Sequence, residues 1–242
     1  PGGWRSAEKR LRRFLDRKLR TYDHDRNEPS LDATSHMSPY LHFGMVSARK
    51  VALEARELAM ADDGRASSDA FLEQLLVRRG LAFNFAARSA KHRTFAGLPD
   101  WAKATLAKHE HDARQYTVSK KDLEDARSPD ELWNAAQLEL RARGVIHNYV
   151  RMLWGKLVIL WSEHPEEAHQ TLVYLNDKYA LDGRDPDGYT NISWCFGLHD
   201  RPWPERNVLG TVRTMSSAST ARKYDLDGYL ASARQWRDEI GL

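Results

Sequence analysis

Two arginines in this 242-residue chain stand where a guanidinium group needs a partner. Arg151 lies in an apolar stretch of the sequence, and Arg184 lies in a stretch rich in glycine and proline. Each of them needs a carboxylate or a phosphate, because an unpaired buried charge is costly. Nearby aspartates supply carboxylates: Asp177, Asp182, Asp185, Asp187 and Asp200. The pattern indicates either structural ion pairs or the binding of an anionic ligand.

A second candidate is the hydroxyl-rich segment 34–40, which reads Thr-Ser-His-Met-Ser-Pro-Tyr and precedes a predicted helix. Hydroxyl groups and free backbone N–H groups at the start of a helix can hold a phosphate. Ordinary helix capping has the same sequence pattern, and the segment alone favours capping. Both interpretations stay open at this point.

Three tryptophans, Trp133, Trp154 and Trp161, lie in the most regular part of the chain. Trp154 and Trp161 are two helical turns apart, which predicts that they share one helix face about 10.5 Å apart along the axis. Aromatic residues at this spacing usually belong to a hydrophobic core. A functional role is worth testing because Arg151 lies just before Trp154.

Basic residues also stand close to aromatic residues, and this pattern suits a nucleic-acid backbone and an unstacked base as well as a solvated surface. The net charge of +3 favours an anionic partner only weakly. The histidines lack metal-ligand spacing, and a single cysteine, Cys195, excludes an intrachain disulfide and a cysteine cluster for zinc. We therefore expect no metal. The basic residues in question are Arg78, Arg79, Arg88, Lys91, Arg93, Arg201, Arg206 and Arg213.

The elements that must position these residues are predicted to be helices almost throughout. Residues 62–64 are expected to end one of them, and residues 181–210 are expected to form a long irregular loop, which is often a functional feature. The predicted helices cover residues 4–22, Ser47 to about 60, 68–88, 100–110, Ser128 to about 143, 145–162, 165–179, and about 226 onward.

Two of these helices carry further predictions. Ser128 is expected to be the N-cap of its helix, with Pro129 at the first helical position and Glu131 completing a capping box. The helix over 145–162 is apolar on nearly all sides, so we expect it to be central and buried.

The predicted fold is all-α, with one helical domain over residues 1–242 and no strand pattern, repeat or linker. No apolar run is long enough to span a membrane, so no membrane partner is expected. We expect a monomer in the cytoplasm, associated with the nucleoid if the source is bacterial, or located in the nucleus if it is eukaryotic.

Six blocks of sequence share one order and spacing with a known family. They are FLEQLLVRRGLAFNF at 71–85, LWNAAQ at 132–137, RMLWGK at 151–156, YLNDKY at 174–179, LDGRDP at 181–186 and GLHDRPWPERNVLGTVR at 197–213. Over essentially its whole length the chain resembles the flavin-binding helical domain of the class II DNA photolyases, which use light to split cyclobutane pyrimidine dimers. The resemblance implies an all-α FAD-binding domain without the N-terminal α/β antenna domain, so no antenna chromophore is expected in this chain.

The resemblance also implies a site for FAD. Tyr22 and the segment Thr34, Ser35, His36, Met37 and Ser38 resemble the residues that hold the FAD diphosphate, which favours the phosphate interpretation of that segment. Arg151 and Asp182 resemble a salt bridge beside the isoalloxazine ring, a pairing that favours an anionic flavin. Asn176 resembles the asparagine that faces flavin N5. The remaining implied cofactor-binding residues are Arg78, Gly183 and Arg184.

The implied reaction is photochemical: excited reduced FAD gives an electron to a dimer flipped out of DNA, the cyclobutane ring opens, and the electron returns. Trp133, Trp154 and Trp161 match the electron-transfer tryptophans of the family. Met152 and Trp194 resemble walls of the dimer pocket. The implied catalytic residues are Gln74, Arg151, Asn176 and Asp182, and the implied lesion and DNA contacts also include Asn148, Asp200, Arg201, Trp203 and Arg206.

The chain departs from the family pattern at several positions. Gln74 replaces a glutamate that hydrogen-bonds the thymine pair, and an amide brings neither a negative charge nor an acid proton, so we expect less efficient repair. Gly80 replaces a glutamate in a helix, at a cost of about 1 kcal/mol in helix propensity. Asn148 stands where class II usually has glycine. The second signature is altered at Leu209, Thr211, Thr214 and Ser216.

Two alternatives remain open. The first is a repair-impaired photolyase-like flavoprotein or blue-light photoreceptor that binds FAD and DNA, for which Gln74 is the main reason. The second is a DNA-binding module without a cofactor.

Overall fold

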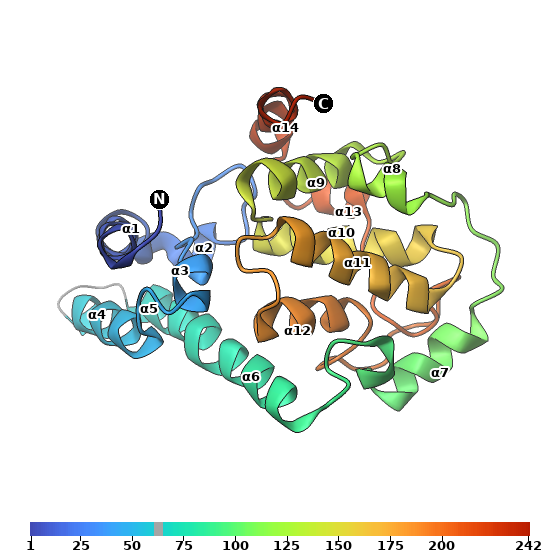
Figure 1. Cartoon of the computed structure of the whole chain (residues 1–242), viewed down its shortest axis with the longest axis horizontal. Coiled ribbons are helices and arrows are strands. Elements are labelled where there is room, and N and C mark those ends of the chain that lie inside the picture. Colours follow the sequence, from blue (N-terminus) through green and yellow to red (C-terminus); the bar gives the residue numbers. More distant parts are fainter. Residues whose placement is uncertain (61–64) are drawn as a thin grey trace. The chain divides into compact units, whose positions relative to one another are not determined.

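The computed structural model describes residues 1–60 and 65–242, which form helices and loops without a β-sheet (Figure 1). The predicted all-α fold is confirmed. The chain divides into two compact units, Pro1–Asn84 and Phe85–Leu242, and the prediction of one domain over 1–242 stays a prediction. No helix in the described part is long and apolar enough to cross a membrane. The helix end predicted at 62–64 lies outside the described residues.

The first unit packs around an aromatic cluster. Phe14 contacts Tyr22 and Phe71 with ring-centroid distances of 5.7 and 4.7 Å. The predicted first helix ends at Arg17 rather than at residue 22, because the chain tightens into a 3₁₀ turn, Leu19–Thr21, before the next helix. The helices of this unit are α1 (Trp4–Arg17), α2 (Tyr22–Asp25), α3 (Ser38–His42), α4 (Ala48–Met60), α5 (Arg65–Leu72) and most of α6 (Arg79–Arg88).

The helix predicted over 68–88 is present but not regular. A π-helical segment, Glu73–Arg78, joins α5 to α6. Such segments insert an extra residue into the turn, which redirects the side chains around it, and they are frequent at functional sites. Gln74 and Arg78 both lie in this segment.

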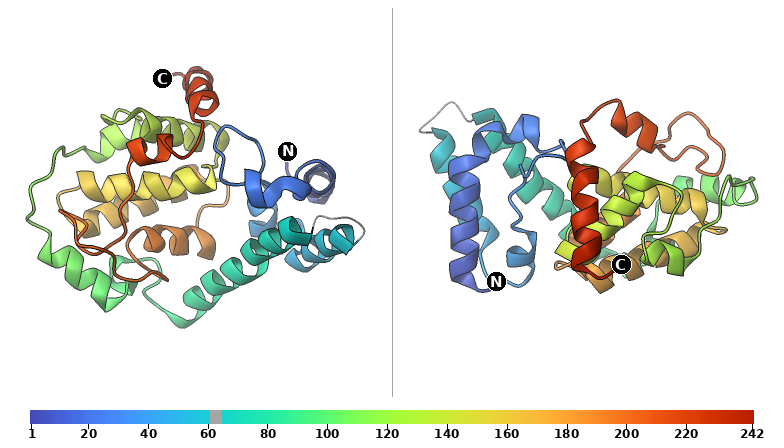
Figure 2. Two further views of the ribbon diagram at one scale, coloured as in Figure 1. Left: turned by 180° about the vertical axis from the view of Figure 1, so that it is seen from behind. Right: turned by 90° about the horizontal axis from the view of Figure 1, so that it is seen from above.

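The second unit is built around α10 (Asn148–Trp161), which packs against α9, α11 and α12. Most residues of α10 are buried, as predicted for this stretch, although the helix begins at Asn148 rather than at 145. Figure 2 shows α14, in red, crossing next to α9, and these two form the most extensive helix pair of the unit. The other helices are α7 (Asp100–Lys108), α8 (Lys120–Glu124), α9 (Glu131–Arg143), α11 (Pro165–Tyr179), α12 (Pro186–Cys195), α13 (Ser217–Ala221) and α14 (Asp227–Glu239).

The predicted cap of α9 is wrong by two residues. Asp130, not Ser128, accepts the backbone N–H of Trp133, at 2.8 Å. The Ser128 hydroxyl contacts the Asn134 side chain instead, so the proline at 129 precedes the helix. A carboxylate near the helix start gains from the helix dipole, which a serine hydroxyl does not. The predicted end of α9 is confirmed, with Gly144 in the left-handed conformation at φ 69°.

The long irregular loop predicted over 181–210 is also wrong in its first half, because it contains α12. Asp185 caps this helix by accepting the backbone N–H of Asp187, and Pro186 occupies its first turn. The glycines and prolines around it hide an ordinary helix start. The short helices α8 and α13 were not predicted either.

Candidate functional site

Three buried indole rings form a continuous array in the second unit. Trp133 on α9 stacks on Trp154 of α10, with ring centroids 6.4 Å apart and planes only 8° apart. Trp161 meets Trp133 edge to face at 5.7 Å. The exposed fractions are 0% for Trp133, 1% for Trp154 and 6% for Trp161. Trp133 is therefore the middle ring, and an electron can move along the array by steps between touching rings.

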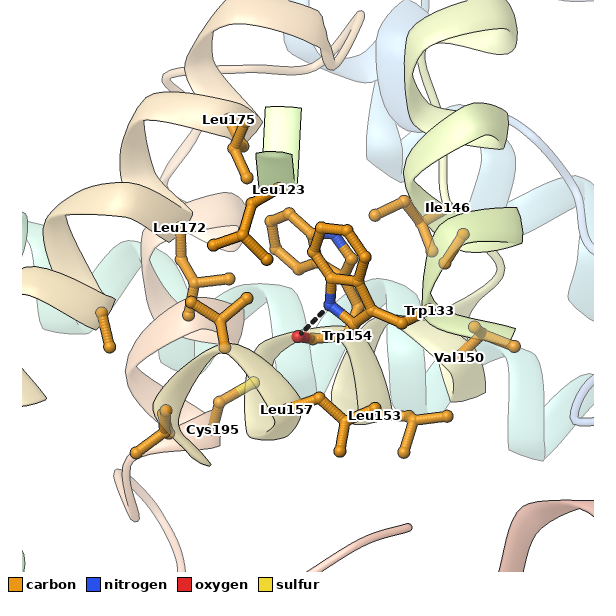
Figure 3. Packing of buried hydrophobic residues seen from close by; sticks show 14 of the residues in the cluster. Leu123, Trp133, Ile146, Val150, Leu153, Trp154, Leu157, Leu172, Leu175 and Cys195 are labelled. Carbon is orange, nitrogen blue, oxygen red and sulfur yellow. Dashed lines mark hydrogen bonds between the residues drawn. The ribbon is translucent and has the colours of Figure 1, made fainter. Parts of the chain in front are cut away.

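The indole N–H groups of Trp133 and Trp154 have neutral partners. Trp133 Nε1 donates to the backbone oxygen of Trp154 at 2.9 Å, which Figure 3 shows as a dashed line. Trp154 Nε1 donates to Oε1 of Gln137 at 3.0 Å. Each hydrogen bond fixes the orientation of its ring within a core of leucine, valine and isoleucine side chains (Figure 3).

Arg151 and Asn176 are brought together by α10 and α11. Arg151 Nη1 donates to Asn176 Oδ1 at 3.0 Å, and Asn176 is buried. A Cβ at position 188 would come within 2.9 Å of Asn176 Nδ2, so the glycine there leaves room for the amide. Among the described residues no ion pair joins Arg151 to Asp182, and that pairing stays a prediction.

Asp177 holds the loop that contains Gly183 and Arg184. Its carboxylate accepts the Arg184 backbone N–H at 3.1 Å and the Tyr189 hydroxyl at 2.9 Å. Burial of Tyr189, together with its bond to Asp177, raises the pKa of that phenol to about 12. Arg184 has a left-handed backbone at φ 66°, and its residue is exposed. Asp177 thus fixes the turn between α11 and α12 on which the predicted cofactor residues lie.

In the first unit, Tyr22 is buried and burial raises its pKa. The guanidinium of Arg26 lies 5.8 Å from the Tyr22 ring centroid, and its buried Nε has no hydrogen-bond partner among the described residues. Sequence reasoning did not select Arg26. Its spacing of four residues after Tyr22 on a helical turn is the signal that could have found it.

The hydroxyl-rich segment of the same unit is partly exposed, and Lys18 Nζ donates to its Thr34 backbone oxygen at 3.3 Å. Thr34 Oγ1 lies 3.4 Å from His36 Nε2, and Ser35 Oγ accepts the Met37 backbone N–H at 3.3 Å. His36 has a left-handed backbone at φ 53°, and Ser38 begins α3. The hydroxyls of Thr34 and Ser35 retain hydrogen-bonding capacity for a ligand.

Gln74 lies partly exposed in the π-helical segment of the first unit, where Arg78 forms an ion pair with Glu73 at 3.1 Å. In the second unit, Trp194 on α12 contacts the His199 ring at 5.5 Å, and Met152 lies beside Cys195 of α12. Asn148 is exposed at the start of α10.

A basic and aromatic cluster follows α12. The guanidinium groups of Arg201 and Arg213 lie 5.4 and 4.9 Å from the Trp203 ring centroid. Asp200 Oδ1 accepts Trp203 Nε1–H at 3.2 Å and the Arg201 backbone N–H at 2.8 Å. The exposed Arg206 exchanges two backbone hydrogen bonds with Gly210. The structure therefore brings together four of the predicted DNA residues on one loop.

Two buried polar side chains of the second unit were missed by sequence reasoning. Gln137 is fully buried and bonds Trp154. Lys156 on α10 is also fully buried, donates to the Cys195 backbone oxygen at the end of α12, and has a pKa lowered to about 8 by burial. A polar residue at an otherwise apolar helix position is the signal that could have selected Lys156.

His109, at the end of α7, fastens the loop after α12 to that helix. Its Nδ1 lies 2.6 Å from Asp112 and its Nε2 lies 2.8 Å from Glu205. Asp112 also accepts the Val208 backbone N–H at 3.0 Å. The bonds to Glu205 and Asp112 raise the pKa of His109 above its ordinary value.

This clamp predicts a pH dependence of stability. Because the folded-state pKa of His109 lies above its ordinary value of 6.5, its stabilising contribution is complete below pH 6.5 and is lost as pH rises through the raised pKa. Urea unfolding of the wild type and of His109→Gln across this range measures it. We expect the stability gap between the two proteins to be largest at low pH and to close as pH rises. A gap that does not change with pH contradicts the clamp.

The chain is similar to known photo-lyases over nearly all its length. It is 42% identical over 238 residues to the deoxyribodipyrimidine photo-lyase of Methanothermobacter thermautotrophicus, covering 98% of this chain and 52% of that protein. It is 44% identical to that of Oryza sativa subsp. japonica over 224 residues, 92% of this chain and 44% of that protein. A cryptochrome-1 of Sinapis alba is 30% identical over 172 residues, 65% of this chain and 31% of that protein. The chain spans about half the length of the first two relatives.

No family model matches the chain. Many solved structures share its fold, including the two that follow. A class III photolyase from Agrobacterium tumefaciens has a TM-score of 0.71 at 19% identity, covering 97% of this chain and 44% of that one. An archaeal photolyase from Sulfolobus tokodaii, solved with two FAD molecules, has a TM-score of 0.62 at 17% identity, covering 96% of this chain and 46% of that one. By its sequence and its helical fold, the chain belongs to the photolyase/cryptochrome superfamily and corresponds to the helical domain of that superfamily.

Proposed function

We propose that this chain repairs cyclobutane pyrimidine dimers in DNA by light-driven electron transfer from reduced FAD, as a class II photolyase. The observation that carries the proposal is the array of Trp154, Trp133 and Trp161, three oxidisable rings in contact inside one core. Indole rings in contact can pass an electron from one to the next, which aliphatic core side chains cannot do. The photo-lyases at 42–44% identity support the same activity.

The residues present fit a flavin nucleotide. In the second unit, the Arg151 cation and the Asn176 amide form a polar pair, and the glycine at 188 leaves space beside that amide. In the first unit, the unpartnered Arg26 Nε and the hydroxyls of Thr34 and Ser35 suit a diphosphate. When bound, FAD supplies the light absorption and the electron.

The proposed tasks of the protein residues are binding, orientation and electrostatics. Arg151, with Asp182 as its proposed partner, places a fixed positive charge that stabilises negative charge on the ring system. Asn176 offers an amide N–H to a ring nitrogen. Tyr22 and residues 34–38 hold the diphosphate, and Arg78, Gly183 and Arg184 complete the cofactor set.

DNA is the proposed partner of the basic loop after α12. The guanidinium groups of Arg201 and Arg206 suit phosphates, and Trp203 offers an aromatic face to an unstacked base. Met152 and Trp194 are the proposed walls around the dimer, with Asn148 and Asp200 as further contacts. A damaged pair costs less to flip out of the duplex, which supplies part of the selectivity.

Restoring the acid at position 74 is expected to raise repair. Gln74→Glu adds a carboxyl group that can hydrogen-bond the dimer and stabilise its radical anion by means of an acid proton. The amide of glutamine has no such proton. We expect a higher yield of split dimers per absorbed photon and unchanged affinity for undamaged DNA. Gln74→Met, which offers neither donor nor charge, serves as the opposite control. Equal yields in all three proteins would rule out a role for this position.

The test of the proposal is direct. The protein is loaded with FAD, reduced, mixed with dimer-containing DNA and illuminated, and the recovery of thymine absorbance is followed. We expect recovery in light and none in the dark.

A second function, a blue-light photoreceptor or repair-impaired flavoprotein, is favoured by Gln74 and by the similarity to cryptochrome-1. Normal flavin photoreduction without dimer splitting would support it. A purified protein that stays colourless and cannot be reconstituted with FAD would leave only DNA binding without a cofactor.

A further inference from the structure

Among the described residues, Gln137 is the hydrogen-bond partner of the indole N–H of Trp154. It lies on α9 with no exposed surface. Its Oε1 accepts Trp154 Nε1–H at 3.0 Å, and its Nε2 donates to the backbone oxygen of Glu124 at 3.4 Å. An indole N–H only donates and a carbonyl only accepts, so these two partners fix which end of the amide faces the ring.

The partner of the next ring is of the same chemical kind. Trp133 Nε1 donates to the backbone oxygen of Trp154. The indole N–H groups of Trp133 and Trp154 therefore both donate to amide oxygens, which are very weak bases. In the part of the chain that the structure describes, no carboxylate or imidazole is hydrogen-bonded to either nitrogen.

The acceptor of each indole N–H decides the fate of an oxidised ring. An indole that loses one electron becomes a radical cation, and its N–H becomes far more acidic. Beside a base the proton leaves, and the neutral radical that remains is a weaker oxidant. Beside an amide oxygen the proton stays, and the cation is stabilised by a charge-assisted hydrogen bond. Only the cation remains a strong enough oxidant to take an electron from the next ring.

We infer that Gln137 is a positioning residue of the electron path. Its amide oxygen accepts the hydrogen bond of the Trp154 N–H without taking the proton, so oxidised Trp154 stays a cation that can take an electron from Trp133. The inference rests on the proposed function. Trp154 gives one electron to photoexcited oxidised FAD, Trp133 gives one to Trp154, and Trp161 gives one to Trp133. The net transfer is one electron from Trp161 to the flavin, with no proton lost at Trp154 or Trp133.

Gln137→Glu tests this with almost no change in shape. The introduced carboxylate can accept the proton of oxidised Trp154. Trp154 then remains as a neutral radical and takes no electron from Trp133. Transient absorption after a laser flash separates the cation from the neutral radical. We expect early neutral radical, loss of the transfer from Trp133, and a lower yield of stable flavin photoreduction.

Formation of the neutral Trp154 radical in Gln137→Glu is expected to depend on pH. Burial raises the pKa of a carboxyl group, and a neutral carboxyl group cannot take the proton, so the neutral radical forms only as pH rises through that value. Arg141 of α9 shares the Glu124 backbone oxygen with Gln137 and bonds Asp125, so Arg141, Glu124 and Asp125 bring charged groups close to position 137. Burial raises the pKa of the Glu124 carboxyl, but its bonds to Lys178 and Tyr179 outweigh burial and lower that pKa below its ordinary value.

Gln137→Met is the matched control, because it fills similar volume without an acceptor or a base. We expect its early radical to remain cationic at every pH. A dark measurement accompanies both variants: the exchange rate and chemical shift of the Trp154 indole proton by NMR, which need no light and no activity. We expect a clear change in both variants relative to the wild type.

The outcomes separate the two claims. A wild type that binds FAD but shows no tryptophan radical after the flash overturns the electron path, and the inference with it. Normal radicals in the wild type, with Gln137→Glu giving the same cation and the same yield at every pH, overturn the inference and leave the proposed function standing. A neutral Trp154 radical in Gln137→Glu only above the titration of its carboxyl supports the inference, because a structural defect would not follow that titration.

Discussion

Replacing Trp133 by phenylalanine is expected to nearly abolish photoreduction of the bound flavin. Trp133 touches both other rings of the array, stacked on Trp154 and edge to face with Trp161. A benzene ring is not oxidised by a tryptophan radical. Oxidised Trp154 therefore has no electron donor and takes its electron back from the flavin. The yield of stable reduced flavin under blue light with an external thiol measures the effect.

Trp236→Phe is the matched control for this variant. Trp236 is buried in the same unit and packs against Tyr229, at 5.3 Å between ring centroids, outside the array. Trp133→Phe also loses a hydrogen bond and leaves a small cavity, at a cost of about 1–3 kcal/mol, so flavin content and folding are checked first. Similar photoreduction in Trp133→Phe and Trp236→Phe, with flavin bound to both, would show that the array is only packing.

Adding one methyl group at Gly155 is expected to cause the largest loss of stability among single small substitutions in α10. A Cβ at this position would overlap Cys195 Sγ and would lie 3.0 Å from Cys195 Cβ. Helices α10 and α12 are packed too closely to accept it, and such overpacking costs about 1–3 kcal/mol or more. Urea unfolding of Gly155→Ala measures the loss.

The clash has a specific remedy. Cys195→Ala removes the sulfur atom, and the 3.0 Å contact with the Cβ at position 195 remains. We expect the double variant Gly155→Ala with Cys195→Ala to recover much of the stability lost in Gly155→Ala, so that the two substitutions are strongly coupled. If the stability changes of the two single variants simply added up in the double variant, α10 and α12 would be accommodating the methyl group by moving apart. The same close approach places Met152 beside α12, so we expect Gly155→Ala to weaken binding of dimer-containing DNA as well.

Much of the fold could be predicted because most of its helices carry strong local signals. The apolar surface of α10 on nearly all sides predicted a central helix, and Gly144 marked the end of α9. The signals failed where two residues compete for one role. Ser128 and Asp130 are both good caps, and only the observed bond to the Trp133 N–H decides between them.

The site could be predicted only in part. Sequence spacing suggested that Trp154 and Trp161 share a face, but it could not show that Trp133 comes between them in space, because that contact depends on how α9 packs on α10. Gln137 was not recognised for the same reason, since its partner is 17 positions away on another helix. Arg151 was expected to need a carboxylate or a phosphate, and the hydrogen-bond partner that the structure gives it is the neutral amide of Asn176.

The central claim is that reduced FAD bound to this chain splits dimers in light, and a defined oligonucleotide with one thymine cyclobutane dimer tests it most directly. Wild type and Trp133→Phe are both loaded with FAD, reduced chemically, mixed with the oligonucleotide and illuminated, and the repaired strand is quantified by chromatography. Chemical reduction makes the tryptophan array unnecessary, so we predict repaired strand from both proteins in light and from neither in the dark. No repaired strand in light, with reduced FAD and DNA both bound, would contradict the account.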